Sequence, residues 1–595
     1  MWRQRWADGK TGRSGGLRTR RRHALDAPIF MKTLKGDSMR RKYFHQKLTR
    51  LNCKIKIIGR AALPVLLSSA ITGCGGDDNV TSQVFSCATD VYPSNTGATT
   101  PAPILASPQV WSFVSAPNLH PMKVNVNYSD PVRLAEGLIF NSPYTGSNTA
   151  MYGQNGALIA DNAGNPVWFN ALNSVSLMNF DFRVQQYFGM PVLTFWQGTV
   201  ATPPAYTNLP SGAAEPGACY YIVNNRYQTI KTVSARNGFV ADNHEFLITP
   251  SNTGLFLATK VVPMDLTPYG GPKNGAIHDF SIQEVDLTTN ELVFFWDAKD
   301  HIALESSHLP ASTATATSNV WDPYHLNSLD LVANNNNDIV FSARSTWTVY
   351  RLHKPTGEFV WKLAGDGSGD FKIPAGNAQF SWQHDARYIS DNVISMFDDA
   401  CDDCYASIPP GTAPSHGLVL NLDFNNMVAT AQTSYYHNPN LFSSAQGNTQ
   451  WLGNGNKFIG WGNGYYTEFA QPGNTELMPA TSTLYDVKMA GDNISYRTYR
   501  QAWVATPYYP PSVTVAAGNS GPAVYASWNG STETRSWQVY AGAAANNLRL
   551  IASSAKTGFE TKIPLTGNSY AYVQVKAIDN AGAIIGVSDI KNIFK

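Results

Sequence analysis

A chain of 595 residues, 43% of them hydrophobic and only 14% charged, is long enough for two or three domains. Its abundant Gly, Pro and aromatic residues favour short strands joined by tight turns over long amphipathic helices. The net charge of +2 conceals a basic leader, because the part after Gly73 carries 26 basic and 39 acidic residues and a net charge of −13. We therefore expect an all-β protein with no nucleic-acid partner.

The first 73 residues are predicted to be a secretion signal. Basic residues up to Arg60 precede an apolar stretch at 61–71, and Gly73 comes directly before Cys74. This order is typical of a signal peptide, and Ile71-Thr-Gly-Cys74 resembles the bacterial lipobox, whose cysteine becomes lipidated. The apolar stretch is short for a membrane span, although a transmembrane anchor is the alternative. We expect an exported bacterial lipoprotein, anchored to a membrane through Cys74 and located in the periplasm or at the outer membrane.

Composition divides the remaining chain into four parts. Residues 74–105 are rich in Ser, Thr, Asn, Ala and Pro, which predicts a tether between the lipid and the folded body. A β segment is expected at 106–134 and a repetitive β domain at 135–506. After a Pro-rich turn, three runs that alternate apolar and polar residues predict a β-sandwich of fibronectin type III character at 507–595.

The central domain repeats a unit in which a histidine leads into an apolar strand. His244, His325 and His384 each open such a unit, which continues with a turn, a second apolar strand and an outer pair of strands. Four strands per repeat are typical of a β-propeller blade. Less regular copies occupy 135–170, 175–235 and 447–503. We therefore expect about six blades.

The shared register predicts that these three histidines meet. The inner strand of each blade lines the central channel of a propeller, so equivalent positions in several blades lie on one ring. The alternative is that the histidines only cap strands and bond to backbone groups. The same reasoning places further polar candidates near the ring, namely Asn327, Ser328, Arg344, Asp385, Arg387 and His437.

Four cysteines lie outside the leader and the anchor. In an oxidising compartment this even number favours disulfides. Cys401 and Cys404 are separated by two residues and predict a local structural bridge. A redox motif or half of a zinc site is the weaker alternative, because no second such pair and no helix-opening context accompany them. The pairing of Cys87 and Cys219 stays open.

Around these histidines the sequence resembles the arylsulfotransferase family. The shared motifs read Asp242-Asn-His-Glu-Phe246, His325-Leu-Asn-Ser328 and Gln383-His-Asp-Ala386, and the similarity runs from about Gly137 to near the end. The resemblance implies a six-bladed propeller that moves a sulfuryl group from an aryl sulfate to a phenol. It implies no nucleotide sulfate donor, no cofactor and no metal.

The resemblance also implies roles for particular residues. In the family a channel histidine is transiently sulfated, and other histidine, asparagine and arginine side chains surround it. An imidazole can accept the group and release it again, which splits one displacement into two. The expected catalytic residues are His325, His384, His437 and Arg344, with His437 as the sulfated nucleophile, and the expected substrate-binding residues are Asn327, His244 and Arg387.

One segment departs from the family pattern. Family members often carry Phe-Asp-Asn followed by an arginine, whereas this chain reads Phe397-Asp-Asp-Ala-Cys-Asp-Asp403. A group of carboxylates at this place is expected to repel sulfate, unless Arg344 or Arg387 compensates.

Two other functions fit the same pattern. A non-catalytic cell-surface binding propeller predicts that alanine at His325 and His384 leaves ligand binding intact. A metal-dependent propeller hydrolase or lyase predicts a stoichiometric metal ion held by three histidines.

Overall fold

The computed structural model confirms the all-β fold class. It describes Cys87 and residues 106–594, apart from 146–151, 173, 202–208, 316–317, 334, 375, 377, 403–410, 472–481, 519–520 and 567–569. The helical elements among these residues are five single 3-10 turns, η1 (Thr267–Tyr269), η2 (Ala298–Asp300), η3 (Leu304–Ser306), η4 (Ala311–Thr313) and η5 (Arg344–Thr346).

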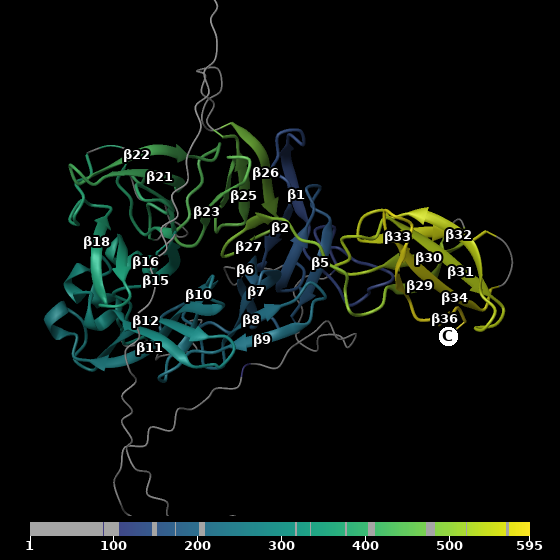
Figure 1. The fold of residues 1–595 in the computed structure, drawn as a ribbon, viewed down its shortest axis with the longest axis horizontal. Coiled ribbons are helices and arrows are strands. Elements are labelled where there is room, and N and C mark those ends of the chain that lie inside the picture. The colour runs from purple at the N-terminus through teal and green to yellow at the C-terminus, as the bar shows by residue number, and fades with distance from the viewer. Residues whose placement is uncertain are drawn as a thin grey trace, which may run out of the picture. The chain divides into compact units, whose positions relative to one another are not determined.

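Six antiparallel sheets, numbered here in chain order, make up most of the described chain (Figure 1). Sheet 1 is β28 (Tyr499–Gln501), β2 (Leu138–Asn141), β4 (Gly156–Ala160) and β5 (Pro166–Ala171). Sheet 2 is β6 (Met178–Tyr187), β7 (Met190–Gly198), β8 (Cys219–Val223) and β9 (Thr229–Val233). Sheet 3 is β10 (Val240–Ile248), β11 (Thr253–Met264), β12 (Gly275–Asp286) and β13 (Leu292–Asp297), with β14 (Val320–Trp321) parallel to β12.

The other three sheets follow the same strand order. Sheet 4 is β15 (Leu326–Val332), β16 (Asn335–Ala343), β17 (Thr348–His353) and β18 (Glu358–Ala364). Sheet 5 is β19 (His384–Ser390), β20 (Val393–Asp398), β21 (His416–Asp423) and β22 (Val428–Tyr435). Sheet 6 is β23 (Asn448–Trp451), β24 (Lys457–Gly460), β25 (Tyr465–Phe469), β26 (Thr483–Met489) and β1 (Val124–Ser129). A small pair, β3 (Tyr144–Thr145) and β27 (Asn493–Ile494), lies outside them.

The six sheets form a closed ring. Strand β2 contacts β6, β6 contacts β10, β10 contacts β15, β15 contacts β19, β19 contacts β23, and β24 of sheet 6 contacts β28 of sheet 1. The ring closes inside sheet 1, where Leu138 of β2 pairs with Gln501 of β28 from the far end of the domain. Because β6, β10, β15 and β19 contact one another in sequence, they lie at the inner edge of the ring.

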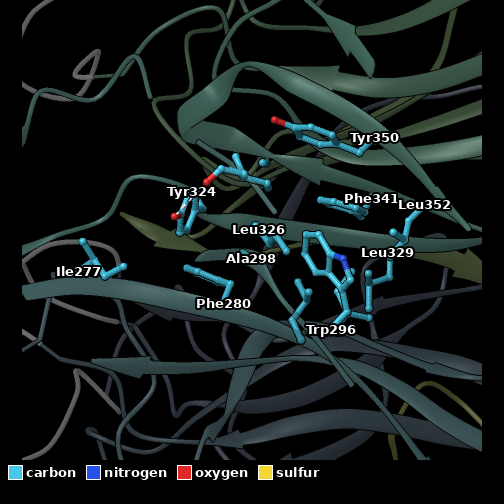
Figure 2. Packing of buried hydrophobic residues seen from close by; sticks show 14 of the residues in the cluster. Ile277, Phe280, Trp296, Ala298, Tyr324, Leu326, Leu329, Phe341, Tyr350 and Leu352 are labelled. Carbon is cyan, nitrogen blue, oxygen red and sulfur yellow. Dashed lines mark hydrogen bonds between the residues drawn. The ribbon is translucent and has the colours of Figure 1, made fainter. Parts of the chain in front are cut away.

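The hydrophobic core lies between neighbouring sheets. Strand β8, which reads Cys-Tyr-Tyr-Ile-Val, is buried along its whole length, as expected for a strand covered on both faces. Figure 2 shows one such interface, where Phe280 and Trp296 of sheet 3 face Leu326 and Phe341 of sheet 4. Burying each such side chain contributes about 1.5–3 kcal/mol, so the packed interfaces hold the inner strands in fixed positions.

Two further sheets follow the ring. One is β29 (Ser512–Gly518), β30 (Gly521–Ser527) and β33 (Glu560–Pro564), and the other is β32 (Arg549–Ala555), β31 (Ser536–Gly542), β34 (Tyr572–Ile578) and β35 (Ile584–Val587), with β36 (Lys591–Asn592) beside β34. They share a core that includes Trp537, Val539 and Val575. The Asn529 side chain accepts from the backbone N–H of Phe169 and donates to its carbonyl, both at 2.9 Å, which ties this part to strand β5.

Several predictions fall on residues at the edge of the described chain or beyond it. Cys87 and Cys219 form a disulfide with Cα atoms 5.6 Å apart, which settles the pairing left open by the sequence. Cys401 is disulfide-bonded, whereas Cys404 lies outside the described residues.

The leader at 1–73 and Cys74 also lie outside the described residues, so lipidation stays a prediction. Among the described residues, no helix has the length and apolar character needed to cross a membrane.

Candidate functional site

The inner strands of three adjacent sheets bring three histidines together. His244 lies in β10, His325 directly precedes β15, and His384 opens β19. One ring nitrogen of each lies within 4.8 Å of one ring nitrogen of the other two. The ring centroids of His244 and His325 are 4.9 Å apart, and that of His384 is 6.5 Å from both. We call these three residues the histidine cluster.

The pairing of the inner strands is irregular at or beside each of these side chains. The register of β10 shifts between Ala241 and Phe246, that of β15 between Leu326 and Ser328, and that of β19 between His384 and Arg387. A bulge adds an unpaired residue and redirects the local side chains, and it is frequent beside active sites. His325 has a φ of 50°, in the left-handed region that costs a non-glycine residue energy.

Each histidine of the cluster is held by a carboxylate. A carboxylate that accepts a hydrogen bond from Nδ1–H fixes the ring orientation and leaves Nε2 with its lone pair free. For His384 a second contact indicates that the proton is on Nδ1, because Nε2 accepts a hydrogen bond from the backbone N–H of Gln446 at 3.2 Å. The three Nδ1 contacts are His244 with Asp242 at 2.6 Å, His325 with Asp322 at 2.6 Å and His384 with Asp399 at 2.7 Å.

Burial and positive charge keep two of these imidazoles neutral. Burial lowers the pKa of His384 well below its usual value, and the nearby Arg344 and the other two cluster histidines lower it further. Burial also lowers the pKa of His325, although Asp322 opposes that shift. Burial raises the pKa of the Asp399 carboxyl, and the Arg344 guanidinium opposes the rise. A neutral imidazole whose Nε2 carries no proton can act as a nucleophile or a base near neutral pH.

Arg344 stands beside the histidine cluster. Its backbone N–H donates to the carbonyl of His325 at 2.9 Å, which fixes its position relative to that histidine. One Nη donates to Asp402 at 2.6 Å and to the carbonyl of Ser444 at 2.8 Å. The Nε–H has no partner among the described residues although it is buried. A buried cation with an unused donor is suited to hold an anion.

Asn327 and Arg387, predicted to bind substrate, both make hydrogen bonds inside the protein. The Asn327 amide donates to the carbonyl of Gln383 at 2.7 Å and so ties β15 to the residue before His384. Arg387 donates to Asp385 at 2.9 Å, to the carbonyl of Leu329 at 2.7 Å and to Glu245 at 2.7 Å. Those donors of Arg387 are therefore occupied inside the protein.

The structure does not bring His437 into the histidine cluster. Its Nδ1 contacts the carbonyl of Pro439 at 2.7 Å, and its Nε2 contacts Asp486 at 2.8 Å. Its ring packs against Trp461 and Tyr465 of the sheet 6 region. Its Nε2 therefore faces the Asp486 carboxylate and not the histidine cluster.

The described carboxylates of the 397–403 segment make defined contacts at the site. Asp399 orients His384, Asp402 pairs with Arg344, and Asp398 accepts from the backbone N–H of Ser381 at 2.9 Å. Two of these acidic side chains therefore position the groups of the site. Asp403 lies outside the described residues.

A network of buried charges adjoins the cluster, and no sequence motif indicated it. Glu245 lies among three arginines: Arg387 at 2.7 Å, Arg497 at 2.9 Å and Arg183, whose guanidinium it also contacts directly. Asp181 and Asp385 complete a set of three cations and three anions. We call these six residues the charge network. Since Glu245 follows His244 and Asp385 follows His384, the network anchors the strands that carry the cluster.

Three aspartates and a tyrosine also contact the histidine cluster, and the sequence did not predict these contacts. Asp242 precedes His244 by two residues and Asp322 precedes His325 by three, so this short spacing was the available signal. Asp399 comes from the next strand connection. Tyr496 lies against the cluster, with its ring centroid 5.4 Å from that of His244 and 6.4 Å from that of His384. No sequence motif indicated Tyr496, because it lies far along the chain from the histidines, between β27 and β28.

The histidine cluster has the donors of a transition-metal site. Three imidazoles with carboxylates on their Nδ1 atoms are a common arrangement around zinc. The same arrangement also suits transfer of a group from a substrate to a histidine nitrogen. Metal binding and group transfer both use the lone pair of an unprotonated Nε2.

Comparison with known proteins gives one family. The family model for Arylsulfotransferase (ASST) matches residues 183–478, which include the whole histidine cluster. No curated protein matches the sequence. Among solved structures, the chain is similar to a protein of unknown function from Bacteroides caccae, at 12% identity and a TM-score of 0.34, over 61% of this chain and 98% of that one. It is similar to Sqt1 of Saccharomyces cerevisiae at 10% identity and a TM-score of 0.27, over 64% of this chain and 82% of that one.

Proposed function

This chain belongs to the arylsulfotransferase family, and on that premise we propose that it moves a sulfuryl group from an aryl sulfate to a phenolic acceptor through the histidine cluster. The observation that carries the proposal is the meeting of three imidazoles, each oriented by a carboxylate, beside the buried Arg344. Sulfuryl transfer resembles phosphoryl transfer, in which positioning and charge stabilisation dominate.

We assign the transient acceptor of the sulfuryl group to His384. Its ring is neutral because burial and the nearby guanidiniums of Arg344 and Arg497 oppose its protonation. The Arg344 guanidinium would stabilise the negative oxygens of a sulfuryl group bound to its Nε2. Asp399 would stabilise the positive charge that the ring gains when Nε2 forms the new bond.

The reaction then runs in two displacements. In the first, the Nε2 of His384 gives up its hydrogen bond with the Gln446 N–H, and its lone pair attacks sulfur. The S–O bond to the aryl group breaks, and its electron pair leaves on a phenolate that takes a proton from solvent. In the second, His325 accepts the proton of the phenolic acceptor, whose oxygen attacks sulfur while the N–S bond breaks and returns its pair to His384. His325 later gives the proton to solvent. Arg344 would hold the sulfuryl oxygens in both steps.

The test is release of nitrophenol from p-nitrophenyl sulfate in the presence of phenol. We expect release that depends on phenol, formation of phenyl sulfate, and no loss of activity after treatment with a chelator. If the purified protein holds a stoichiometric metal ion and regains activity only when that metal is returned, the metal-dependent alternative is favoured. If nitrophenol is not released and alanine at His325 and His384 leaves ligand binding intact, the binding-protein alternative is favoured.

The fold that supports this proposal is a six-bladed propeller. We infer that sheets 1–6 are its blades, because they follow in chain order, contact their neighbours in a closed ring and present β6, β10, β15 and β19 at its inner edge. We infer that the two sheets of 512–592 are a sandwich of fibronectin type III character, with Trp537 in their shared core.

We further propose export and lipid anchoring through Cys74. The support is the lipobox-like sequence Ile71-Thr-Gly-Cys74 after an apolar stretch. In bacteria given labelled palmitate, the full chain should incorporate the label and sediment with membranes. The Cys74→Ser variant should do neither, and equal labelling of both proteins would exclude the anchor.

A further inference from the structure

Three aromatic rings form a continuous group beside Arg344. His308 stacks on Trp347 with centroids 3.6 Å apart and the planes 5° from parallel. Trp347 meets Trp382 at 5.4 Å and 76°, so the two indoles form a near-perpendicular corner. The guanidinium carbon of Arg344 lies 4.8 Å from the centroid of the Trp382 ring. We call His308, Trp347 and Trp382 the aromatic wall.

Chain connections tie the aromatic wall to the reacting groups. Trp382 precedes His384 by two residues, and Trp347 follows Arg344 by three. The backbone N–H of Trp347 donates to the carbonyl of Arg344 at 3.2 Å, and that of His308 donates to the carbonyl of Ser345 at 2.7 Å. Movement of the wall relative to Arg344 would break these bonds, so the two are positioned together.

Two features separate the wall from an ordinary core cluster. All three residues keep part of their surface exposed, whereas most aromatic residues of the ring interior are fully buried. Trp347 and Trp382 also have φ values of 49° and 58°, in the left-handed region that costs a bulky residue energy. Such conformations persist where the surrounding structure enforces them, and they gather at ligand sites.

From this geometry we infer that the aromatic wall is the subsite for the aryl group of the substrate. The inference rests on the proposed function, because it places the sulfate at Arg344 and His384 and the attached ring on the exposed parts of Trp382 and Trp347. A perpendicular corner offers one ring face for stacking and one ring edge for a T-shaped contact. A fused two-ring phenol such as 2-naphthol can use both, so the subsite favours it over phenol.

Binding of product alcohols tests the subsite without any transfer reaction. Calorimetric titration of the full chain with 2-naphthol, phenol and cyclohexanol should give affinities in that order. Trp382→Leu should weaken 2-naphthol binding about 10-fold, whereas Trp382→Phe, which keeps an aromatic ring, should retain most of the affinity. Trp451→Leu is the matched control, because Trp451 is a part-exposed indole of β23 that carries a lysine, Lys457, on its face.

The kinetic readout separates binding from chemistry. For 2-naphthyl sulfate, Trp382→Leu should raise KM by about 10-fold and leave kcat within about 3-fold of the wild type. The inference is overturned if Trp382→Leu binds 2-naphthol as tightly as the wild type with unchanged melting temperature, or if Trp382→Phe is as weak as Trp382→Leu. If the wild type transfers no sulfuryl group but binds 2-naphthol in a Trp382-dependent way, the proposed function fails and the aryl subsite stands.

Discussion

Replacing His384 by alanine is expected to lower the rate of sulfuryl transfer by about 10³-fold or more. The variant loses the only atom that accepts the sulfuryl group in the proposed reaction, and removal of a catalytic nucleophile has effects of this size or larger. The measurement is nitrophenol release from p-nitrophenyl sulfate at saturating phenol. Acid-quenched wild type incubated with the donor alone should gain the mass of one sulfuryl group, on a peptide that contains His384, and the His384→Ala variant should not.

Two other histidine variants make this prediction specific. His437→Ala is the matched control, because both nitrogens of His437 bond within the protein and its ring packs outside the histidine cluster. It should keep a rate close to that of the wild type. His325→Ala should slow the second displacement by about 10²-fold, as expected for loss of a general base, and should let the sulfated form accumulate. A sulfated peptide that contains His437 instead would show that the assignment to His384 is wrong.

The sequence was sufficient to predict where the histidines meet. His244, His325 and His384 stand at the same register of three repeats, and radial repetition turns that register into proximity. His437 was misplaced because it follows β22, at the outer edge of sheet 5, where no shared register applies. The residues around His437 in the sequence do not indicate which side of the sheet its imidazole faces.

Other parts of the site depend on features that no local pattern carries. The bulges in β10, β15 and β19 decide which side chains face the centre, and a bulge follows from strand pairing more than from residue type. Asp399 was expected to repel sulfate, yet it lies 2.7 Å from Nδ1 of His384 because the connection after β20 turns back toward β19. The sequence showed the acidic residues of this segment but not that one of them orients His384.

The largest effect on stability is expected at Glu245, in the charge network. Burial opposes ionisation of this carboxyl, but Arg183, Arg387 and Arg497 outweigh it and hold the pKa of Glu245 well below its usual range. Glu245→Gln keeps the shape but leaves three buried guanidiniums with two carboxylates. Removing one partner of a buried ionic group costs about 3–5 kcal/mol, so the free energy of unfolding in urea should fall by about that amount at pH 7.

The pH dependence of that loss distinguishes charge from packing. A carboxyl whose pKa is depressed by folding contributes stability that is fully present above its unfolded pKa, about 4.3, and that is lost as the pH falls from there toward the folded pKa. The difference between wild type and Glu245→Gln should therefore shrink below about pH 4. Glu291→Gln is the matched control, because Glu291 is an exposed carboxylate before β13 and its loss should leave the urea midpoint unchanged. A difference that stays constant down to pH 3 would mean that shape, and not charge, explains the loss. Glu245 follows His244 and Asp385 follows His384, so a loss of order in the charge network should displace these histidines. The rate of sulfuryl transfer should therefore also fall in Glu245→Gln, although no atom of Glu245 takes part in the proposed reaction.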